Sequence, residues 1–336
     1  MRRIWPLFVM LPVVILCATV SSLCSTLTIV PLLLPSPSTR DTLPAQDLAY
    51  PDSRFVEVSG TEVHYVEVGE GDTVFLLLHG FGASTYSWQG MMEPLSRYGR
   101  VIAYDRPGFG LTERPRAGEY DPTRNPYATD TQPDLAVALM DALGVEQAVL
   151  VGHSAGGSVA VATALRYPER VRALVLESPA VLEAREPVLS WVDPLLRSPQ
   201  SRRLGPWLAR LFAGRADSFL ETAWEHPERI SAEMREGYQR PFRVEGWDRG
   251  LWEVVMASGA DDLRASLGDI RAPAVVITGD GDRIVPPENS RQVAEAIPGV
   301  RYLEVPDCGH IAHEECPAEF LAHVDEFLQE VGLAAP

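Results

Sequence analysis

The 336 residues of this chain are enough for one large α/β domain with an insertion, or for two domains. A formal net charge of −17 argues against a nucleic-acid partner, because phosphate binding needs a basic surface. With 46% hydrophobic and 22% charged residues, the composition is that of a globular protein, and four cysteines are too few for a disulfide scaffold.

The N-terminus is mostly apolar. Two arginines precede an uncharged run from Ile4 to Leu34, which is longer than the roughly 20 residues that cross a bilayer as a helix. We expect residues 1–34 to form an uncleaved membrane anchor, with the arginines cytoplasmic and the rest of the chain extracytoplasmic. Cleavage as a signal peptide within residues 18–22, which would release a secreted protein, is the alternative. Residues 35–53 are rich in Pro, Ser and Asp and are expected to form a linker.

Eight later segments have the pattern of β-strands. The first two alternate apolar and polar residues, as half-exposed antiparallel strands do, and most of the others are apolar runs typical of strands buried on both faces. The expected strands are Phe55–Val58, Thr61–Val68, Thr73–Leu78, Val101–Tyr104, Ala148–Val151, Val171–Leu176, Ala274–Thr278 and Tyr302–Val305. Helical segments are expected at 131–143, 288–297 and 317–331. This alternation predicts an α/β fold: a doubly wound, mostly parallel, eight-stranded sheet with helices on both faces.

The alternation breaks between the sixth and seventh strands. Residues 181–269 show no clear strand and several helix-like segments, so we expect a helical cap inserted after the sixth strand, over a core of residues 54–180 and 270–336. Such an insertion lies over the carboxyl ends of the strands, where these folds bind ligands. Its tryptophans either line an apolar pocket or form a small core of the cap itself. They are Trp191, Trp207, Trp224, Trp247 and Trp252.

Ser154 lies at the centre of a Gly-x-Ser-x-Gly turn between a predicted strand and a predicted helix. The flanking Gly152 and Gly156 suit a bend too sharp for a Cβ, and the bend projects the serine hydroxyl into a cleft. Free N–H groups at the start of the helix point to the same place, where negative charge can be held. A tight turn with an incidental serine and a phosphate-binding loop are the alternatives, but the G-x-G-x-x-G spacing and the Walker lysine are missing.

A serine nucleophile needs a base, and the base needs a third group to orient it. Asp280 and Asp282 follow the seventh predicted strand, and His310 follows the eighth. All of them therefore reach the same edge of the sheet as Ser154. Asp282 is preferred as the acid because Asp280 is nearer the strand end, where it would hold the turn.

Other residues near these loops have competing interpretations. Glu177, at the end of the sixth strand, is the remaining candidate for the orienting acid. His313 is a rival to His310 as the base only because it is close by in the sequence, and we expect it to be structural or on the surface. Cys308 and Cys316 could pair in an oxidising compartment, but we expect two free, buried thiols. The segment from His310 to Cys316 lacks metal-site spacing, so no metal is expected.

Four separated motifs resemble those of the α/β-hydrolase family, in its lid-bearing branch, over about residues 55–333. They are His79-Gly80-Phe81-Gly82, Asp105-Arg106-Pro107-Gly108-Phe109-Gly110, Gly152-His153-Ser154-Ala155-Gly156, and the loops of Asp282 and His310. His79 and Asp105 match structural residues that hold loops in that family.

The resemblance implies a role for each site residue. Ser154 would be the nucleophile, His310 the general base and then acid, and Asp282 the orienting carboxylate. The backbone N–H groups of Phe81 and Ala155 would form the oxyanion hole.

Relatives that open epoxides or displace halide carry aspartate where this chain has serine, so an acyl-enzyme intermediate is expected instead. We predict hydrolysis of a carboxylic ester of a medium-sized, apolar acyl substrate, with no cofactor. The alternatives are a hydrolase of C–C bonds in ring-cleavage products and a catalytically inactive, membrane-tethered binding protein. The sequence leaves the oligomeric state open.

Overall fold

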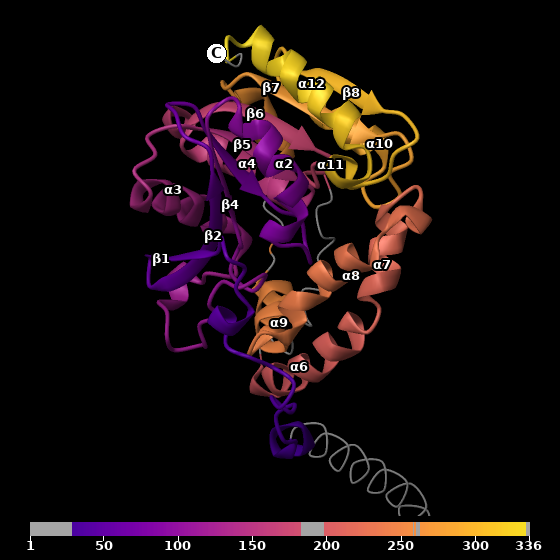
Figure 1. Ribbon diagram of the computed structural model, residues 1–336. Helices are drawn as coiled ribbons and strands as arrows, with labels where there is room; N and C mark the ends of the chain where they lie inside the picture. Colours follow the sequence, from indigo (N-terminus) through magenta and orange to yellow (C-terminus); the bar gives the residue numbers. More distant parts are fainter. Residues whose placement is uncertain (1–28, 183–197, 258, 260–262, 334–336) are drawn as a thin grey trace, which may run out of the picture.

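The computed structural model describes residues 29–182, 198–257, 259 and 263–333 (Figure 1). Its centre is one eight-stranded sheet with the order β1-β2-β4-β3-β5-β6-β7-β8. The pairs β1–β2 and β2–β4 are antiparallel, and every other neighbouring pair is parallel. The strands are β1 Arg54–Val58, β2 Thr61–Val68, β3 Val74–Leu78, β4 Arg100–Tyr104, β5 Ala148–His153, β6 Val171–Glu177, β7 Ala274–Gly279 and β8 Arg301–Val305.

Helices cover both faces of this sheet, which explains its uninterrupted apolar strands. Leu76 and Leu150 point into one core, whereas Phe75 and Val149, their neighbours along the same strands, point into another. The first core is closed by α3 Gln132–Ala142, α4 Ala155–Arg166 and α10 Pro287–Ala296. The second is closed by α2 Gln89–Ser96, α11 Ala312–Glu315 and α12 Pro317–Glu330. The fold class predicted from the sequence is confirmed.

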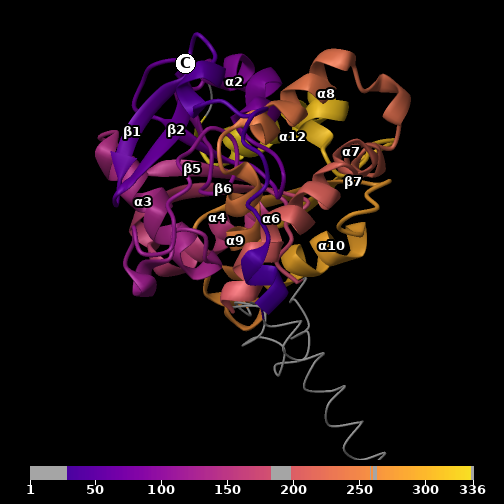
Figure 2. The ribbon, with the colours of Figure 1, turned by 90° about the horizontal axis from the view of Figure 1, so that it is seen from below.

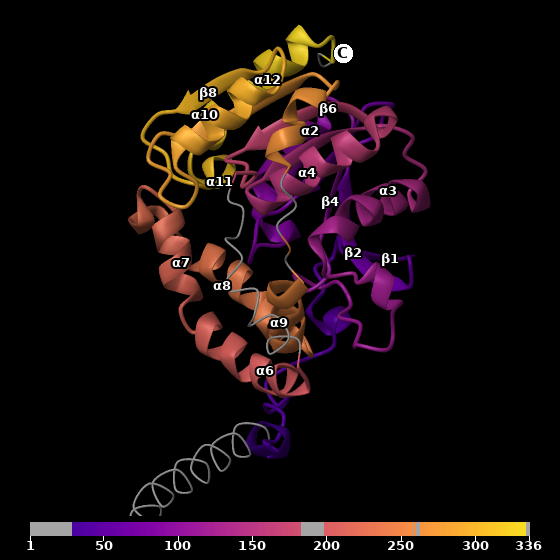
Figure 3. The same ribbon diagram turned by 180° about the vertical axis from the view of Figure 1, so that it is seen from behind.

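Four described helices between β6 and β7 gather on one side of this core (Figures 1 and 3). They are α6 Pro199–Ala213, α7 Ala216–Ala223, α8 Ala232–Gln239 and α9 Trp247–Ala257. Close packing of α6 on α9 requires a glycine, because a Cβ on Gly205 would lie 2.2 Å from the Trp252 ring. The helical cap expected after the sixth strand is therefore present.

The cap tryptophans serve different purposes. Trp224 is buried in a small cluster with Ile311, whereas Trp207 is 41% exposed and donates a hydrogen bond to the Pro35 carbonyl. Trp247 is buried and faces the cavity described below. Trp191 lies outside the described residues.

The membrane anchor and the extracytoplasmic placement expected from the N-terminus are corrected. In the part of the chain that the structure describes, no helix is both long enough and apolar enough to span a bilayer. Residues 29–33 are helical. The helix ends before Pro35, because a proline disfavours helical backbone at the residue before it, and Pro37 comes soon after. Residues 1–28, which make up most of the expected anchor, lie outside the described residues.

The segment expected as a linker packs along the cap. The Leu43 N–H donates to the Arg243 carbonyl at 2.7 Å, and the Glu245 N–H donates to the Leu43 carbonyl at 2.9 Å. The Arg203 guanidinium donates to the Leu34 carbonyl at 2.8 Å. Figure 2 shows this early segment passing beside α6 and α9.

Candidate active site

Ser154 occupies the sharp turn from β5 to α4. Its backbone has φ 53° and ψ −120°, a left-handed conformation that costs energy for a residue with a side chain. The two flanking glycines are required by sterics: a Cβ on Gly156 would lie 2.0 Å from the Leu78 carbonyl oxygen, and one on Gly152 would lie 2.7 Å from the Gly156 carbonyl oxygen. The turn therefore presents the serine at the carboxyl edge of the sheet.

His310 and Asp282 meet at the same edge, from the loops that follow β8 and β7. The imidazole Nδ1 donates to Asp282 Oδ2 at 2.8 Å, and both side chains are buried. The other carboxylate oxygen, Oδ1, accepts from the N–H groups of Ile284 at 2.8 Å and Val285 at 2.9 Å. With Nδ1 bonded to the carboxylate, Nε2 is the ring nitrogen left to exchange a proton.

The loop that carries His310 is held by Glu315, which the sequence motifs did not single out. Glu315 Oε2 accepts from the N–H groups of Gly309 at 2.7 Å and Glu225 at 3.0 Å, and Oε1 accepts from the His226 N–H at 2.7 Å. One carboxylate thus joins the histidine loop to the segment of the cap between α7 and α8. In the sequence, Glu315 stands out only as an acidic residue five positions after His310. The neighbouring residues do not reveal that it binds the cap.

Glu177 and His313 pair with each other instead of joining this site. His313 Nδ1 donates to Glu177 at 2.6 Å, and the imidazole stacks on Trp88 with ring centroids 4.1 Å apart. Burial lowers the pKa of His313, but the Glu177 carboxylate more than compensates, so the net shift is upward. His313 is thus buried away from the surface. Asp280 is exposed and accepts from the Cys308 N–H at 3.4 Å.

Cys308 and Cys316 form a disulfide bond, with their Cα atoms 6.3 Å apart. The expectation of two free thiols is therefore wrong. The short helix α11 turns the chain back, so that Cys316 returns to the loop after β8. The bond closes the loop on which His310 lies.

Phe81 and Ala155 line the same cavity as Ser154, one from the loop after β3 and the other from the start of α4. Neither backbone N–H donates a hydrogen bond to any residue that the structure describes. The Phe81 loop is fixed by His79, whose Nδ1 donates to the Gly80 carbonyl at 2.8 Å while Nε2 accepts from the Arg106 N–H at 3.0 Å. Burial lowers the pKa of His79 to about 3, which keeps the ring neutral, as this acceptor role requires.

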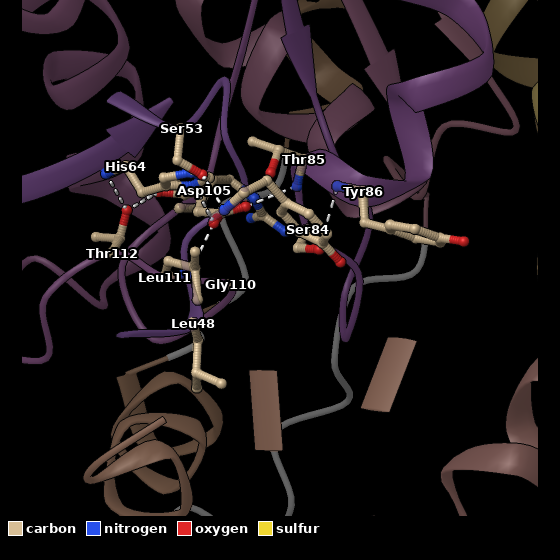
Figure 4. Close-up of polar contacts among 12 residues, drawn as sticks. Leu48, Ser53, His64, Ser84, Thr85, Tyr86, Asp105, Gly110, Leu111 and Thr112 are labelled. Atoms are coloured by element: carbon tan, nitrogen blue, oxygen red, sulfur yellow. Dashed lines mark hydrogen bonds and ion pairs between the residues drawn. The ribbon is translucent and has the colours of Figure 1, made fainter. Parts of the chain in front are cut away.

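Asp105 connects three segments around the site (Figure 4). Its carboxylate accepts from His64 Nδ1 at 2.7 Å, from the Thr85 N–H at 2.6 Å and from the Leu111 N–H at 2.7 Å. Burial would raise the pKa of Asp105, but His64, His79 and the hydrogen bond from the Leu111 N–H bring it to about 2.

Ser53 Oγ lies 2.8 Å from His64 Nε2, so the same carboxylate completes a second serine, histidine and aspartate arrangement. The cavity beside it measures only about 10 Å³, which leaves no room for a substrate. This arrangement holds loops together.

Ser154 and His310 line one cavity of about 330 Å³ between the sheet edge and the cap. Phe81 and Ala155 border it as well, and most of the remaining wall is apolar. Cap residues in that wall include Phe212, Phe219, Leu220, Phe242, Trp247 and Leu251. The site is therefore an apolar pocket lined by a serine, a histidine and the residues that carry two N–H groups without a partner among the described residues, an arrangement suited to acyl transfer.

Comparison with known proteins agrees with this geometry. Residues 73–317 match the model of the alpha/beta hydrolase fold family. The chain is 32% identical over 288 residues to 2-hydroxymuconate semialdehyde hydrolase of Pseudomonas sp. (strain CF600), covering 84% of this chain and 95% of that protein.

Two solved structures are also similar. The enol-lactonase from Burkholderia xenovorans LB400 has a TM-score of 0.66 and 28% identity, covering 82% of this chain and 100% of the other. A thermophilic esterase from Thermogutta terrifontis has a TM-score of 0.63 and 26% identity, covering 83% of this chain and 99% of the esterase chain. The family match covers most of the chain, and the described strands and helices follow the same architecture. The chain belongs to the alpha/beta hydrolase fold family.

Proposed function

We propose that this hydrolase cleaves a C–C bond next to a ketone, through an acyl-enzyme on Ser154. The observation that carries the proposal is the cavity lined by both Ser154 and His310, with Asp282 bonded to the far nitrogen of the imidazole. The hydrolase of 2-hydroxymuconate semialdehyde, similar over 95% of its length, supports this reaction ahead of the ester hydrolysis expected from the sequence.

In the first half-reaction, His310 Nε2 takes the Ser154 proton as the hydroxyl oxygen bonds to the ketone carbon. The carbonyl electron pair moves onto oxygen, and the N–H groups of Phe81 and Ala155 stabilise that charge. The pair then returns to re-form the carbonyl, and the C–C bond breaks, its electrons leaving with the departing carbon. The imidazolium protonates this carbon. Asp282 stabilises the imidazolium while it exists.

In the second half-reaction, His310 removes a proton from water, and the resulting hydroxide attacks the acyl carbon. Collapse returns the proton to Ser154 and releases a carboxylic acid. The departing carbon must be a stabilised carbanion, so the substrate needs a second carbonyl conjugated with the breaking bond. A vinylogous diketone meets this requirement.

Ester hydrolysis is the second candidate, and the apolar cavity wall favours it. An ester follows the same two half-reactions with an alkoxide as the leaving group, which needs no conjugated carbonyl. The similarity to a thermophilic esterase supports this candidate.

Labelling with a fluorophosphonate tests whether the site is catalytic. We expect rapid, stoichiometric labelling of the wild-type protein and none of Ser154→Ala. An Asp282→Asn variant should label far more slowly, since the same change in a protease triad costs about 10⁴ in turnover. Equal labelling of Ser154→Ala would reject the nucleophile, and a wild-type protein that resists labelling would favour a binding protein without catalysis.

A substrate comparison separates the two reactions. Purified protein is assayed with a vinylogous diketone and with p-nitrophenyl esters of graded chain length. We expect kcat/KM for the diketone to exceed that for every ester. The reverse order would replace C–C cleavage by ester hydrolysis as the function, without changing the roles of Ser154, His310 and Asp282.

A further inference from the structure

A second cavity, of about 300 Å³, lies directly beyond the oxyanion donors. It shares Phe81, Phe109, Ala155 and Ala180 with the cavity that contains Ser154. A substrate bound at the serine therefore has two directions in which to extend. One is the apolar cavity under the cap, and the other is this side cavity, which lies against the start of α4.

The side cavity is lined by a buried arginine that has no counter-ion among the residues that the structure describes. Arg106 is only 6% exposed, and neither Nε nor Nη2 has a hydrogen-bond partner within the described residues. Its guanidinium lies 5.1 Å from the centroid of the Phe109 ring. The neighbouring Asp105 carboxylate is already engaged by His64 and two backbone N–H groups. An unpaired buried charge is costly to maintain, so its presence beside a cavity needs a reason.

Two further features describe what would fit against Arg106. Burial lowers the pKa of Arg106 to about 10, so the side chain is still a cation at neutral pH. Gln132 also lines the cavity, with Nε2 donating to the Pro126 carbonyl at 2.6 Å and Oε1 buried without a partner. The remaining wall is largely apolar and includes Tyr127 and Val159. The side cavity thus suits an apolar stem that ends in an anion.

The cavity at Ser154 lacks an equivalent group. Arg114 is the one arginine among its described lining residues, and its terminal nitrogens donate to the carbonyls of Thr112 at 2.8 Å and Gly110 at 2.7 Å. Asp217 on the same wall would repel an anion. A negatively charged substrate therefore finds its matching charge in the side cavity.

We propose that the side cavity is a carboxylate subsite, in which Arg106 binds a carboxylate carried by the substrate while the reacting carbonyl lies at Ser154. This inference rests on the proposed acyl-transfer function and adds a substrate class to it, namely compounds with a carboxylate on a short apolar stem. The guanidinium supplies a charge-assisted pair, and the stem contacts Phe109 and its apolar neighbours.

Matched esters test the subsite. Each p-nitrophenyl ester of a straight-chain monocarboxylic acid is paired with the half-ester of the dicarboxylic acid of equal length, from five to nine carbons. At the best length, we expect kcat/KM for the half-ester to exceed that of its neutral partner by about 10- to 100-fold, the range of a hydrogen bond to a charged group. Arg106→Met should abolish this preference and leave the neutral ester within about twofold.

Two variants serve as checks on this result. Gln132→Glu nearly preserves the shape of the side cavity but adds a competing negative charge, so it should also abolish the preference, whether or not Arg106→Met folds. Arg124→Met removes a positive charge from an exposed residue outside both cavities and should change neither ester. Equal kcat/KM for both esters at every length in the wild-type protein would overturn the subsite, as would equal loss of both in Arg106→Met.

A binding measurement separates failure of the subsite from failure of the proposed function. If neither the esters nor the vinylogous diketone is cleaved, the acyl-transfer function fails. In that case, and also if only the diketone is cleaved, the subsite is tested by titrating adipate into Ser154→Ala. Saturable binding that Ser154→Ala/Arg106→Met lacks supports the subsite. Adipate that binds both proteins equally, or neither, overturns it.

Discussion

Burial sets the protonation of the side chains around Ser154 and His310. It lowers the pKa of His79 to about 3 and that of His153 well below its usual value, in the second case with help from the neighbouring His310. Both rings are neutral as a result, and both contact the backbone. His153 Nε2, for example, lies 3.0 Å from the His310 carbonyl oxygen. Neutral histidines at these places add no positive charge beside the cavity at Ser154.

Glu314 is the acid most strongly affected by burial near the site. Burial raises its pKa from 4.5 to about 7, and Tyr238 donates to its Oε1 at 2.9 Å. The folded protein therefore holds this proton more tightly than the unfolded chain does. Its contribution to stability is complete below pH 4.5 and is lost as the pH rises through about 7.

We predict that Glu314→Gln removes this fall in stability with rising pH. Between pH 4.5 and 8, the free energy of unfolding of the variant should gain roughly 2–3 kcal/mol relative to wild type, as the size of the pKa shift implies. Urea denaturation at several pH values measures the difference. Glu93→Gln, on an exposed part of α2, is the matched control and should run parallel to wild type. A constant difference between Glu314→Gln and wild type would contradict the prediction.

Among the described helices and strands, α6 has the most exposed large apolar side chains. Leu208, Leu211 and Phe212 are 50%, 72% and 59% exposed, although Phe212 also borders the cavity at Ser154. The opposite face packs against α9, with Gly205 against Trp252. One face of this helix thus packs against α9, while Phe212, on the exposed face, also lines the pocket.

Gly205→Ala should loosen the cap. The new Cβ would lie 2.2 Å from the Trp252 ring, so α6 or the indole must move, and overpacking of this kind costs about 1–3 kcal/mol. Denaturation followed by tryptophan fluorescence measures the loss. Gly214→Ala, at the end of the same helix, meets its nearest atom at 3.6 Å and should be neutral or slightly stabilising. Equal stability of the two variants would show that α6 does not depend on this contact.

At the scale of the whole molecule, the sheet and the cap differ in the size of their buried apolar clusters. Two large clusters enclose both faces of the sheet, and every residue of β3 and β5 is buried. The cap relies on two small clusters, one around Trp247 and one around Trp224. Local opening follows the density of buried apolar contacts, so the cap is expected to open at lower free energy than the sheet.

Hydrogen exchange tests this difference. Amides of α6 and α8 should exchange at least about tenfold faster than those of β3 and β5, because about 1.4 kcal/mol of lower opening energy gives that factor. Covalent labelling of Ser154 should slow exchange in the cap helices that line the pocket and leave β3 unchanged. Protection of α6 equal to that of β5 would mean that the cap and the sheet open as one unit.

The sequence alone was sufficient for the fold class and for the turn at Ser154. Apolar runs and their spacing reflect burial on one or both faces, and the glycines around Ser154 reflect a local steric limit, so neighbouring residues reveal both. Local pattern also predicts a membrane span at the N-terminus, but no helix in the described part of the chain is long and apolar enough to form one.

Only the tertiary structure decided which groups meet. It paired Glu177 with His313, joined Cys308 to Cys316, and placed the Arg106 guanidinium beside a cavity without a counter-ion among the described residues. These partners come from separate strands and loops, and a hydrogen bond depends on differences of a few tenths of an ångström. Composition and spacing along the chain carry no information at that precision, whereas the packed sheet and its loops set it.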